Sequence, residues 1–135
     1  MNRQQIEELA AQIVDSLIEV HREKGPGLLE SAYEMCLCRE FSLRGIPFEP
    51  QKPMPVFYKG ASMDCGYRLD LLVADTIVLE LKAVADLLPI HEAQLLTYLR
   101  LADKPLGFLI NFNVRRMKDG LHRFAHTLPP HQRRP

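Results

Sequence analysis

The chain has 135 residues, which is enough for one domain around one modest hydrophobic core. Its hydrophobic content of 47% and charged content of 25% are ordinary for a globular protein, and no apolar run approaches the roughly 18 residues of a membrane span. Net charge is zero, which argues against a protein that holds DNA through many non-specific phosphate contacts. The charge is uneven, because residues 100–135 carry 8 Lys or Arg against 2 Asp or Glu.

The N-terminal segment and the cysteines indicate the cellular compartment in which the protein is expected. The first residues form a charge-rich amphipathic pattern without an apolar signal region, so we expect a cytoplasmic protein. Cys36, Cys38 and Cys65 form no CxxC pair, which argues against a disulfide framework or a zinc knuckle.

Two helices are predicted first in the chain. Apolar residues spaced by three and four from Ile6 to Ile18 mark one helical stripe. Asn2 and Gln5 resemble a capping box at its start, and the Gly25-Pro26-Gly27 segment ends it. A second helix is expected from about residue 29 to residue 44, where Gly45 provides a left-handed stop.

Extended segments follow. Residues 47–58 contain four prolines, which cannot donate to a β-ladder, so this segment is predicted to be an edge strand or a loop beside one. Lys59-Gly60 is predicted to turn. Residues 67–73 and 76–84 then form two β-rich segments, which predict a hairpin around Ala74-Asp75.

The last third of the chain is predicted to contain a third helix and two further strands. Pro89 is well placed in the first turn of a third helix, and residues 106–112 form an apolar run typical of a central strand. Asp119-Gly120 is predicted to turn into a short strand, residues 121–124. We therefore expect one α/β domain over residues 1–128, of order ααβββαββ, and a disordered tail over residues 129–135.

Two acids and a lysine interrupt the most hydrophobic part of the sequence. Glu80 and Lys82 are two residues apart and share one face of a strand. If the hairpin loop has three residues, Asp70 lies opposite Glu80, and a bulge is the other way in which the two acids can meet. A two-residue loop instead pairs Asp70 with Leu79 and separates the acids onto opposite faces.

Opposed acids on one face are chemically informative. Their Cβ atoms lie about 4.5–5.5 Å apart, where two like charges destabilise a sheet. A divalent cation converts the repulsion into a ligand set, and carboxylate oxygens suit Mg²⁺ or Mn²⁺. Lys82 beside such a site can stabilise charge on a phosphodiester or help to activate water. The alternative is a solvated set of surface ion pairs that also includes Arg68, a kind of pair worth little energy.

Three motifs carry a family resemblance. Asp70, nine intervening residues and then Glu80-Leu81-Lys82 resemble the D-x(n)-E-x-K signature of the PD-(D/E)XK nuclease superfamily, with Leu69 in place of the proline. The segment from Gln94 to Tyr98 is similar to the QxxxY motif of the RecB-like branch. The segment from Gly27 to Tyr33 resembles the one that names the GxxExxY family of small bacterial proteins, and the likeness runs from about residue 25 to about residue 120.

The resemblance implies a restriction-endonuclease-like sandwich, a mixed central β-sheet flanked by helices. It also implies that Glu30 completes the metal site, that Gln94 braces the cluster and that Tyr98 contacts phosphate or the glutamine. From the residues alone, Glu30 forms an ordinary solvated pair with Glu34, and Gln94 and Tyr98 form a polar helix stripe. Tyr33 either packs in the core or extends its hydroxyl to the site, and His91 is expected to be structural.

The leading functional hypothesis is a Mg²⁺- or Mn²⁺-dependent nuclease, with DNA favoured over RNA as substrate. The alternative is a catalytically inactive nuclease-fold module that binds nucleic acid or a protein partner. A homodimer through the first helix is a further expectation, although its apolar stripe is more simply core. The residues assigned to catalysis are Lys82, Asp70, Glu80, Gln94 and Tyr98, and those assigned to the metal are Asp70, Glu80 and Glu30.

Overall fold

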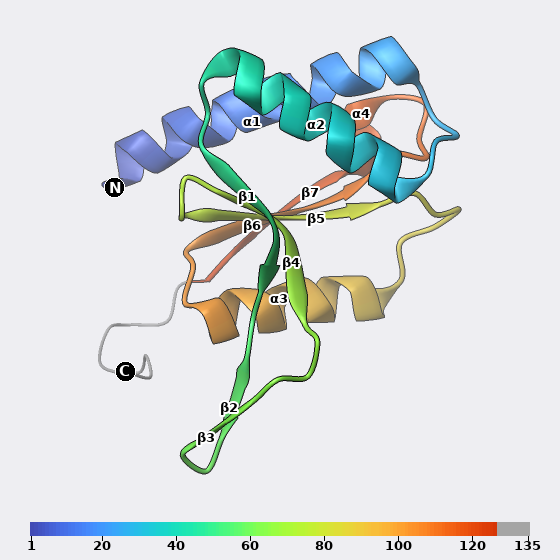
Figure 1. Ribbon diagram of the computed structural model, residues 1–135. Coiled ribbons are helices and arrows are strands. Elements are labelled where there is room, and N and C mark those ends of the chain that lie inside the picture. Colours follow the sequence, from blue (N-terminus) through green and yellow to red (C-terminus); the bar gives the residue numbers. More distant parts are fainter. Residues whose placement is uncertain (127–135) are drawn as a thin grey trace.

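The computed structural model describes residues 1–126 of the chain as a mixed α/β structure. A five-stranded sheet of order β1-β4-β5-β6-β7 forms its centre. Figure 1 shows helices α1 and α2 on one face of this sheet and α3 on the other. This arrangement confirms the predicted sandwich of a mixed sheet flanked by helices.

Local capping residues set the limits of the first two helices. Helix α1 (Arg3–Lys24) begins with the predicted capping box, in which the Asn2 side chain accepts from the Gln5 backbone and the Gln5 side chain accepts in return. Helix α2 (Glu30–Arg44) ends at Gly45, whose φ of 70° and ψ of 24° lie in the left-handed region. Most of the apolar stripe of α1, including Leu9, Ile13 and Leu17, packs into the core, whereas Ile18 is exposed.

The sheet combines antiparallel and parallel neighbours. Strands β1 (Phe48–Pro53), β4 (Arg68–Val73) and β5 (Ile77–Lys82) pair antiparallel in turn, and β6 (Leu106–Asn111) pairs antiparallel with β7 (Leu121–Ala125). Strands β5 and β6 are parallel, and helix α3 (Pro89–Ala102) makes the crossover that a parallel pair requires. Every residue of β6 is buried, as expected for a strand covered on both faces.

The sheet separates two hydrophobic layers. The larger layer joins α1 and α2 to the sheet and includes Leu17, Phe41, Leu71 and Leu79. The smaller layer joins the sheet to α3 through Leu72, Val78, Leu95 and Leu99, among others. Because alternate residues of a strand face opposite sides, the larger layer takes Ile77, Leu79 and Leu81 of β5, and the smaller layer takes Val78.

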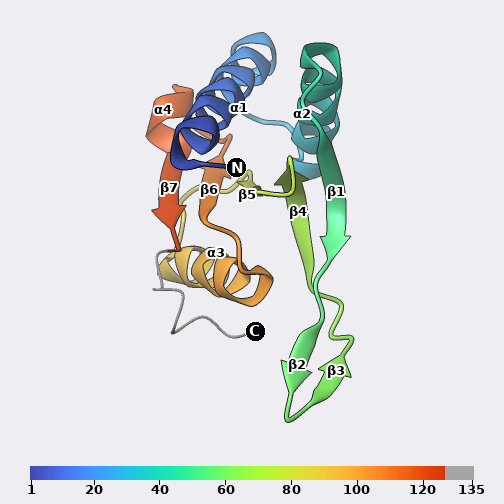
Figure 2. The ribbon, with the colours of Figure 1, turned by 90° about the vertical axis from the view of Figure 1, so that its left-hand side faces the viewer.

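Two short elements differ from the predicted order. The proline-rich segment divides into the edge strand β1 and a separate strand β2 (Val56–Tyr58), which pairs with β3 (Ala61–Met63) in a two-stranded sheet of its own. We call residues 54–67 the finger, because Figures 1 and 2 show this hairpin projecting from the central sheet. Helix α4 (Met117–Gly120) occupies the position where only a turn was expected.

Within residues 1–126, no helix is long and apolar enough to cross a membrane. The predicted disordered tail, residues 129–135, lies outside the residues that the structure describes. The predicted domain limits of 1 and 128 stay a prediction.

Candidate active site

The register of the β4–β5 hairpin determines whether the two acids meet. Val73 pairs with Ile77, so the loop has three residues, and the pairing continues to Leu71 and Leu79. Ala74 and Asp75 both adopt positive φ, at 49° and 54°. The loop therefore has the three residues that the functional interpretation requires, and Asp70 and Glu80 are the next residues of the two strands beyond the Leu71–Leu79 pair.

Side chains replace the main-chain ladder at these two acids. The Asp70 N–H donates to Oε1 of Glu80 at 3.3 Å, and the Leu81 N–H donates to Oδ2 of Asp70 at 2.8 Å. Each carboxylate thus occupies a place that a backbone carbonyl takes in a regular antiparallel pair. The two acids are coupled through the backbone of both strands.

Strand β4 loses its regular alternation at Asp70. Leu71 and Val73 belong to the layer beneath α1 and α2, and strict alternation would put Leu69 with them. Leu69 instead lies in the layer beneath α3, together with Leu72. On the neighbouring strand β1, Gln51 has a φ of 52°, and the register of β1 with β4 leaves Gln51 and Asp70 unpaired. This local irregularity sets the direction of the Asp70 side chain.

Burial and mutual repulsion dominate the electrostatics of the pair. Burial raises the pKa of Glu80 to about 8, and the neighbouring Asp70 carboxylate adds to this shift. Burial also raises the pKa of Asp70, although the Leu81 N–H and the Lys82 charge act in the opposite direction. Glu80 is only 7% exposed, so solvent screens the repulsion little.

A small cleft opens beside Asp70, between α2 and the strands. Its volume is about 210 Å³. Glu30, the first residue of α2, lies at this cleft and accepts at Oε1 from the N–H of Ala83 at 3.2 Å. Because Ala83 directly follows β5, the start of α2 is held at the end of the strand that carries Glu80 and Lys82. The residues that line the cleft are Glu30, Ser31, Glu34, Gln51, Asp70 and Leu81.

Glu34 and Gln51 were not predicted as site residues. Nε2 of Gln51 donates to Oε1 of Glu34 at 2.6 Å, and Gln51 lines the same cleft as Asp70 and acts to lower the pKa of Asp70. Burial raises the pKa of Glu34, and the bond from Gln51 opposes that shift. The spacing of Glu34 four residues after Glu30 indicated a shared helix face. No sequence pattern indicated Gln51, because its position depends on the irregularity of β1.

Lys82 is half-buried at the end of β5, two residues after Glu80. Its charge lowers the pKa of both Asp70 and Glu80, yet it forms no ion pair within 4.0 Å with either in the described part of the chain. Asn111, its partner in the register with β6, was missed by sequence reasoning. Asn111 bonds both the N–H and the carbonyl of Val84, at 3.1 and 2.9 Å, and so fixes the turn after Lys82.

Helix α3 brings one of its two predicted residues to the acids. Tyr98 is half-buried, and the charge of Glu80 contributes, after burial, to raising its pKa. Gln94 is exposed and has no hydrogen bond to Asp70, Glu80 or Lys82 within residues 1–126. His91 is structural, as predicted, because its Nδ1 accepts from the N–H of Leu88 at 3.0 Å in front of the helix.

Tyr33 belongs to the core. It is fully buried and its ring stacks on Phe112 with centroids 4.2 Å apart. Its hydroxyl donates to the Gly25 carbonyl and accepts from the Leu28 N–H, so it fixes the loop in front of Glu30. Its effect on the cleft is therefore one of positioning.

The donor set fits a hard divalent cation in charge and in ligand type. Asp70 is a half-buried and Glu80 a buried carboxylate, burial is the main cause of the raised pKa of each, and Glu30 offers a third set of oxygens at the neighbouring cleft. Among residues 1–126, no group of three or more acid, His or Cys side chains is arranged to hold a metal ion. The residues present therefore supply a close acid pair and a third acid nearby.

Comparison with known proteins agrees with this geometry. The family model of the PD-(D/E)XK nuclease superfamily matches residues 7–124, which extend from α1 to β7 and include the acid pair. No curated protein and no solved structure matches the chain at a significant level. The family match covers most of the 135 residues, and the chain therefore belongs to the PD-(D/E)XK nuclease superfamily.

Proposed function

We propose that this protein is a metal-dependent nuclease that hydrolyses phosphodiester bonds of nucleic acid. The observation that carries the proposal is the Asp70–Glu80 pair, in which each of two acids on adjacent strands accepts from the backbone of the other strand and both pKa values are raised. Such a pair lowers the stability of the sheet on which it lies, and a bound cation removes that cost. Membership of a nuclease superfamily supports the same chemistry.

We assign the metal to Asp70, Glu80 and Glu30, and we propose Mg²⁺ or Mn²⁺. Their oxygens are the ligands that these ions prefer, and both ions retain several waters when they bind one or two carboxylates. The ion, when bound, orients and acidifies water and neutralises charge on the phosphodiester. Glu34, held by Gln51 on the same cleft, is placed to bind a water of the ion or to adjust the charge of Asp70.

Lys82 and Tyr98 are the groups of this chain that we assign to the substrate. Lys82 shares the strand face of Glu80, so its ammonium group is aimed at a phosphate held beside the acids and stabilises the charge that develops there. Tyr98 offers a hydroxyl close to Glu80 for a hydrogen bond to a phosphate oxygen. Gln94 lies one helical turn earlier on α3 and, in this proposal, turns toward the cluster when substrate is present.

We further propose that the chain is of the GxxExxY type and carries the RecB-like QxxxY motif. Each named position of the first motif has a structural task that supports this assignment. Gly27 has a φ of 108°, which favours glycine, Glu30 borders the cleft, and Tyr33 ties down the loop between them. Tyr98 of the second motif lies near the acids, as such an assignment requires.

For the partners we propose nucleic acid, with DNA favoured over RNA, in the cytoplasm. The three cysteines are free, with Cys36 and Cys38 half-buried and Cys65 exposed, which suits a reducing compartment. A homodimer through α1 has less support, because residues such as Leu9, Ile13 and Leu17 of its apolar stripe are buried in the core.

The proposal is tested by cleavage of single- and double-stranded DNA and RNA with Mg²⁺ or Mn²⁺. Wild type is compared with Lys82→Ala and with Lys104→Ala, a matched lysine that pairs with Asp75 at 3.0 Å. We expect cleavage by wild type and Lys104→Ala and a loss of about 100-fold or more for Lys82→Ala. Equal background cleavage by all three proteins would refute the enzymatic claim.

One observation favours the second candidate, a nuclease-fold module that binds nucleic acid or a protein without cutting. Within the described residues, no group of three ligands converges and Lys82 has no ion pair with the acids. A Mn²⁺ titration followed by thermal unfolding separates the two candidates, because ligand binding to the folded state raises its stability. An unchanged melting temperature favours the binding module.

A further inference from the structure

The finger exposes aromatic side chains that folding does not require. Phe57 is 72% exposed and Tyr58 is 55% exposed, although both lie on a strand. The strands β2 and β3 have three residues each and form a sheet separate from the central one. Because so short a hairpin gains little stability from its own surface, these rings contribute little to the fold.

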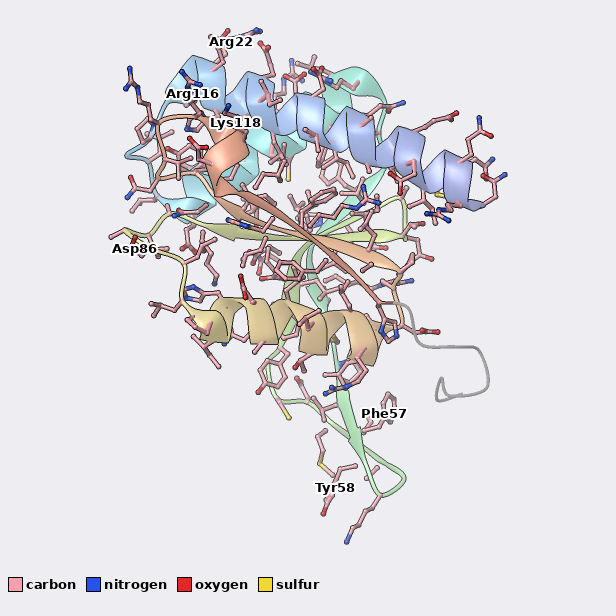
Figure 3. All side chains as sticks on the ribbon, turned by 180° about the vertical axis from the view of Figure 1, so that it is seen from behind. Arg22, Phe57, Tyr58, Asp86, Arg116 and Lys118 are labelled. Atoms are coloured by element: carbon pink, nitrogen blue, oxygen red, sulfur yellow. The ribbon has the colours of Figure 1, made fainter. Side chains whose placement is uncertain are left out.

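The two aromatic rings project from opposite faces of the hairpin. Phe57 pairs with Ser62, while Tyr58 pairs with Ala61 on the other face. Figure 3 shows the two side chains leaving the hairpin on different sides. Rings on both faces of a thin, projecting hairpin suit a wedge that enters between stacked groups.

The finger carries one charged residue of each sign, Lys59 and Asp64. Lys59 occupies the turn with a φ of 48°, a conformation that Gly, Asn or Asp adopts at lower cost. Its ammonium group lies 5.4 Å from the centroid of the Tyr58 ring. The tip thus combines a cation with an aromatic ring.

The base of the finger connects to the candidate active site. The Met54 N–H donates to the Tyr67 carbonyl at 2.9 Å and closes the finger, and Asp70 follows Tyr67 by only three residues. The Tyr67 ring lies 6.1 Å from that of Tyr98, which packs on the α3 side of the sheet. A polymer that passes over the acids and Tyr98 would therefore meet Tyr67 and the finger next.

We infer that the finger binds the unpaired bases of a nucleic-acid strand next to the cleavage site. Phe57 and Tyr58 stack on bases, and Lys59 contacts the phosphate backbone. Aromatic stacking tolerates any base, since every base has a π-face, and basic residues beside it follow the backbone. This inference rests on the proposed function, because it takes nucleic acid as the substrate, and it names a single-stranded or locally opened strand as the form that is bound.

The test uses the absence of tryptophan from this sequence. Phe57→Trp introduces one fluorescent ring at the finger, and Leu43→Trp introduces one at a similarly exposed site on α2, where Leu43 is 64% exposed. Each full-length variant is titrated with oligo-dT and with a blunt duplex in EDTA, so that no cleavage occurs. We expect oligo-dT to quench the tryptophan emission of the Phe57→Trp variant and duplex to quench it much less, with no change in the Leu43→Trp variant.

Affinity is measured in the same buffer by fluorescence anisotropy of labelled oligo-dT. Phe57→Ala with Tyr58→Ala should weaken binding about tenfold or more, given the typical contribution of one stacked base, while Leu43→Ala should not. Unchanged affinity and no quenching would overturn the inference. A wild-type dimer that the double variant converts to a monomer in sedimentation would also overturn it, since the finger would then join two protein chains. Because these readouts need neither metal nor cleavage, they separate failure of this inference from failure of the nuclease proposal.

Discussion

The acid pair and the finger lie on one stretch of chain and depart from ordinary protein surfaces in opposite ways. Glu80 is a carboxylate that is 7% exposed beside a second carboxylate, whereas Phe57 is an aromatic ring that is 72% exposed. Soluble proteins normally hydrate acids and cover aromatic rings. Both departures lie on the stretch of chain from β2 to β5.

The difference between them lies in what each departure costs the fold. The acid pair is bonded to the backbone of both central strands, so its charge acts on the free energy of unfolding. The finger has a sheet of its own, so its rings can change without disturbing the core. Residues that break the usual rules of burial and charge concentrate at functional sites. We expect substitutions at the acid pair to change the free energy of unfolding and substitutions at the finger to leave it nearly unchanged.

The largest effect is expected for Asp70→Asn, measured as metal-dependent cleavage. Asparagine keeps an oxygen that accepts from the Leu81 N–H, so the fold is retained while one negative charge is lost. We expect a decrease of about 100-fold or more. Asp75→Asn is the matched control, because Asp75 lies in the turn of the same hairpin with positive φ, which asparagine tolerates. Equal cleavage by the two variants would show that Asp70 does not belong to the active site.

A large change in stability is expected for Glu80→Gln, and it depends on pH. The pKa of Glu80 is raised to about 8 in the folded chain, so between about pH 4.5 and pH 8 the folded state binds more protons than the unfolded state. The stability of wild type therefore decreases as pH rises through this range, by roughly 1.4 kcal/mol per pKa unit. The glutamine variant lacks this decrease, and at pH 8 its free energy of unfolding should exceed that of wild type by on the order of 4 kcal/mol.

Urea unfolding at pH 5 and pH 8 measures this difference. Glu23→Gln, at an exposed position of α1, is the control and should follow the pH dependence of wild type. If Glu80→Gln also follows wild type, Glu80 does not carry the buried charge that the site requires.

A similar gain in stability is expected when a divalent cation binds wild type. At a Mn²⁺ concentration about 100 times the dissociation constant, linkage gives about 2.7 kcal/mol. The gain should increase toward alkaline pH, because a ligand must lose its proton before it binds metal. Thermal unfolding with and without Mn²⁺ measures it, and Asp70→Asn should lose most of the gain. An equal shift in that variant would place the ion elsewhere.

The smallest effect is expected at the finger. Phe57→Ala with Tyr58→Ala should change the free energy of unfolding by less than about 0.5 kcal/mol, because exposed side chains away from packed contacts contribute little. Urea unfolding at pH 7 measures it. A loss of several kcal/mol would show that the rings support the fold, and the contrast with the acid pair would no longer hold.

The elements that were predicted well have signals within a few residues of sequence. Asn2 and Gln5 cap α1, Gly45 ends α2, and Pro89 begins α3. The prolines limited β1 to an edge strand, which is its position in the sheet. Strand β3 and helix α4 were missed because they have three and four residues, too few for a periodic pattern.

The site was predicted as far as strand geometry allows. The pattern of Asp70, Glu80 and Lys82 gave the candidate residues but left two registers open, and the backbone at Ala74 and Asp75 decides between them. Gln51 was not predictable, because it reaches Asp70 only where β1 and β4 both lose regular geometry. Such irregularity depends on packing between strands that are distant in sequence, and the periodic pattern of apolar residues does not predict it.

The acid pair remains the centre of the account, and a crystal soaked in Mn²⁺ tests it most directly. The anomalous signal of manganese locates the ion without regard to activity or stability. We expect a peak within coordination distance of the carboxylates of Asp70 and Glu80, close to Glu30. A crystal without a peak there, or with manganese bound only at other acids, would contradict the assignment of this pair as the metal site.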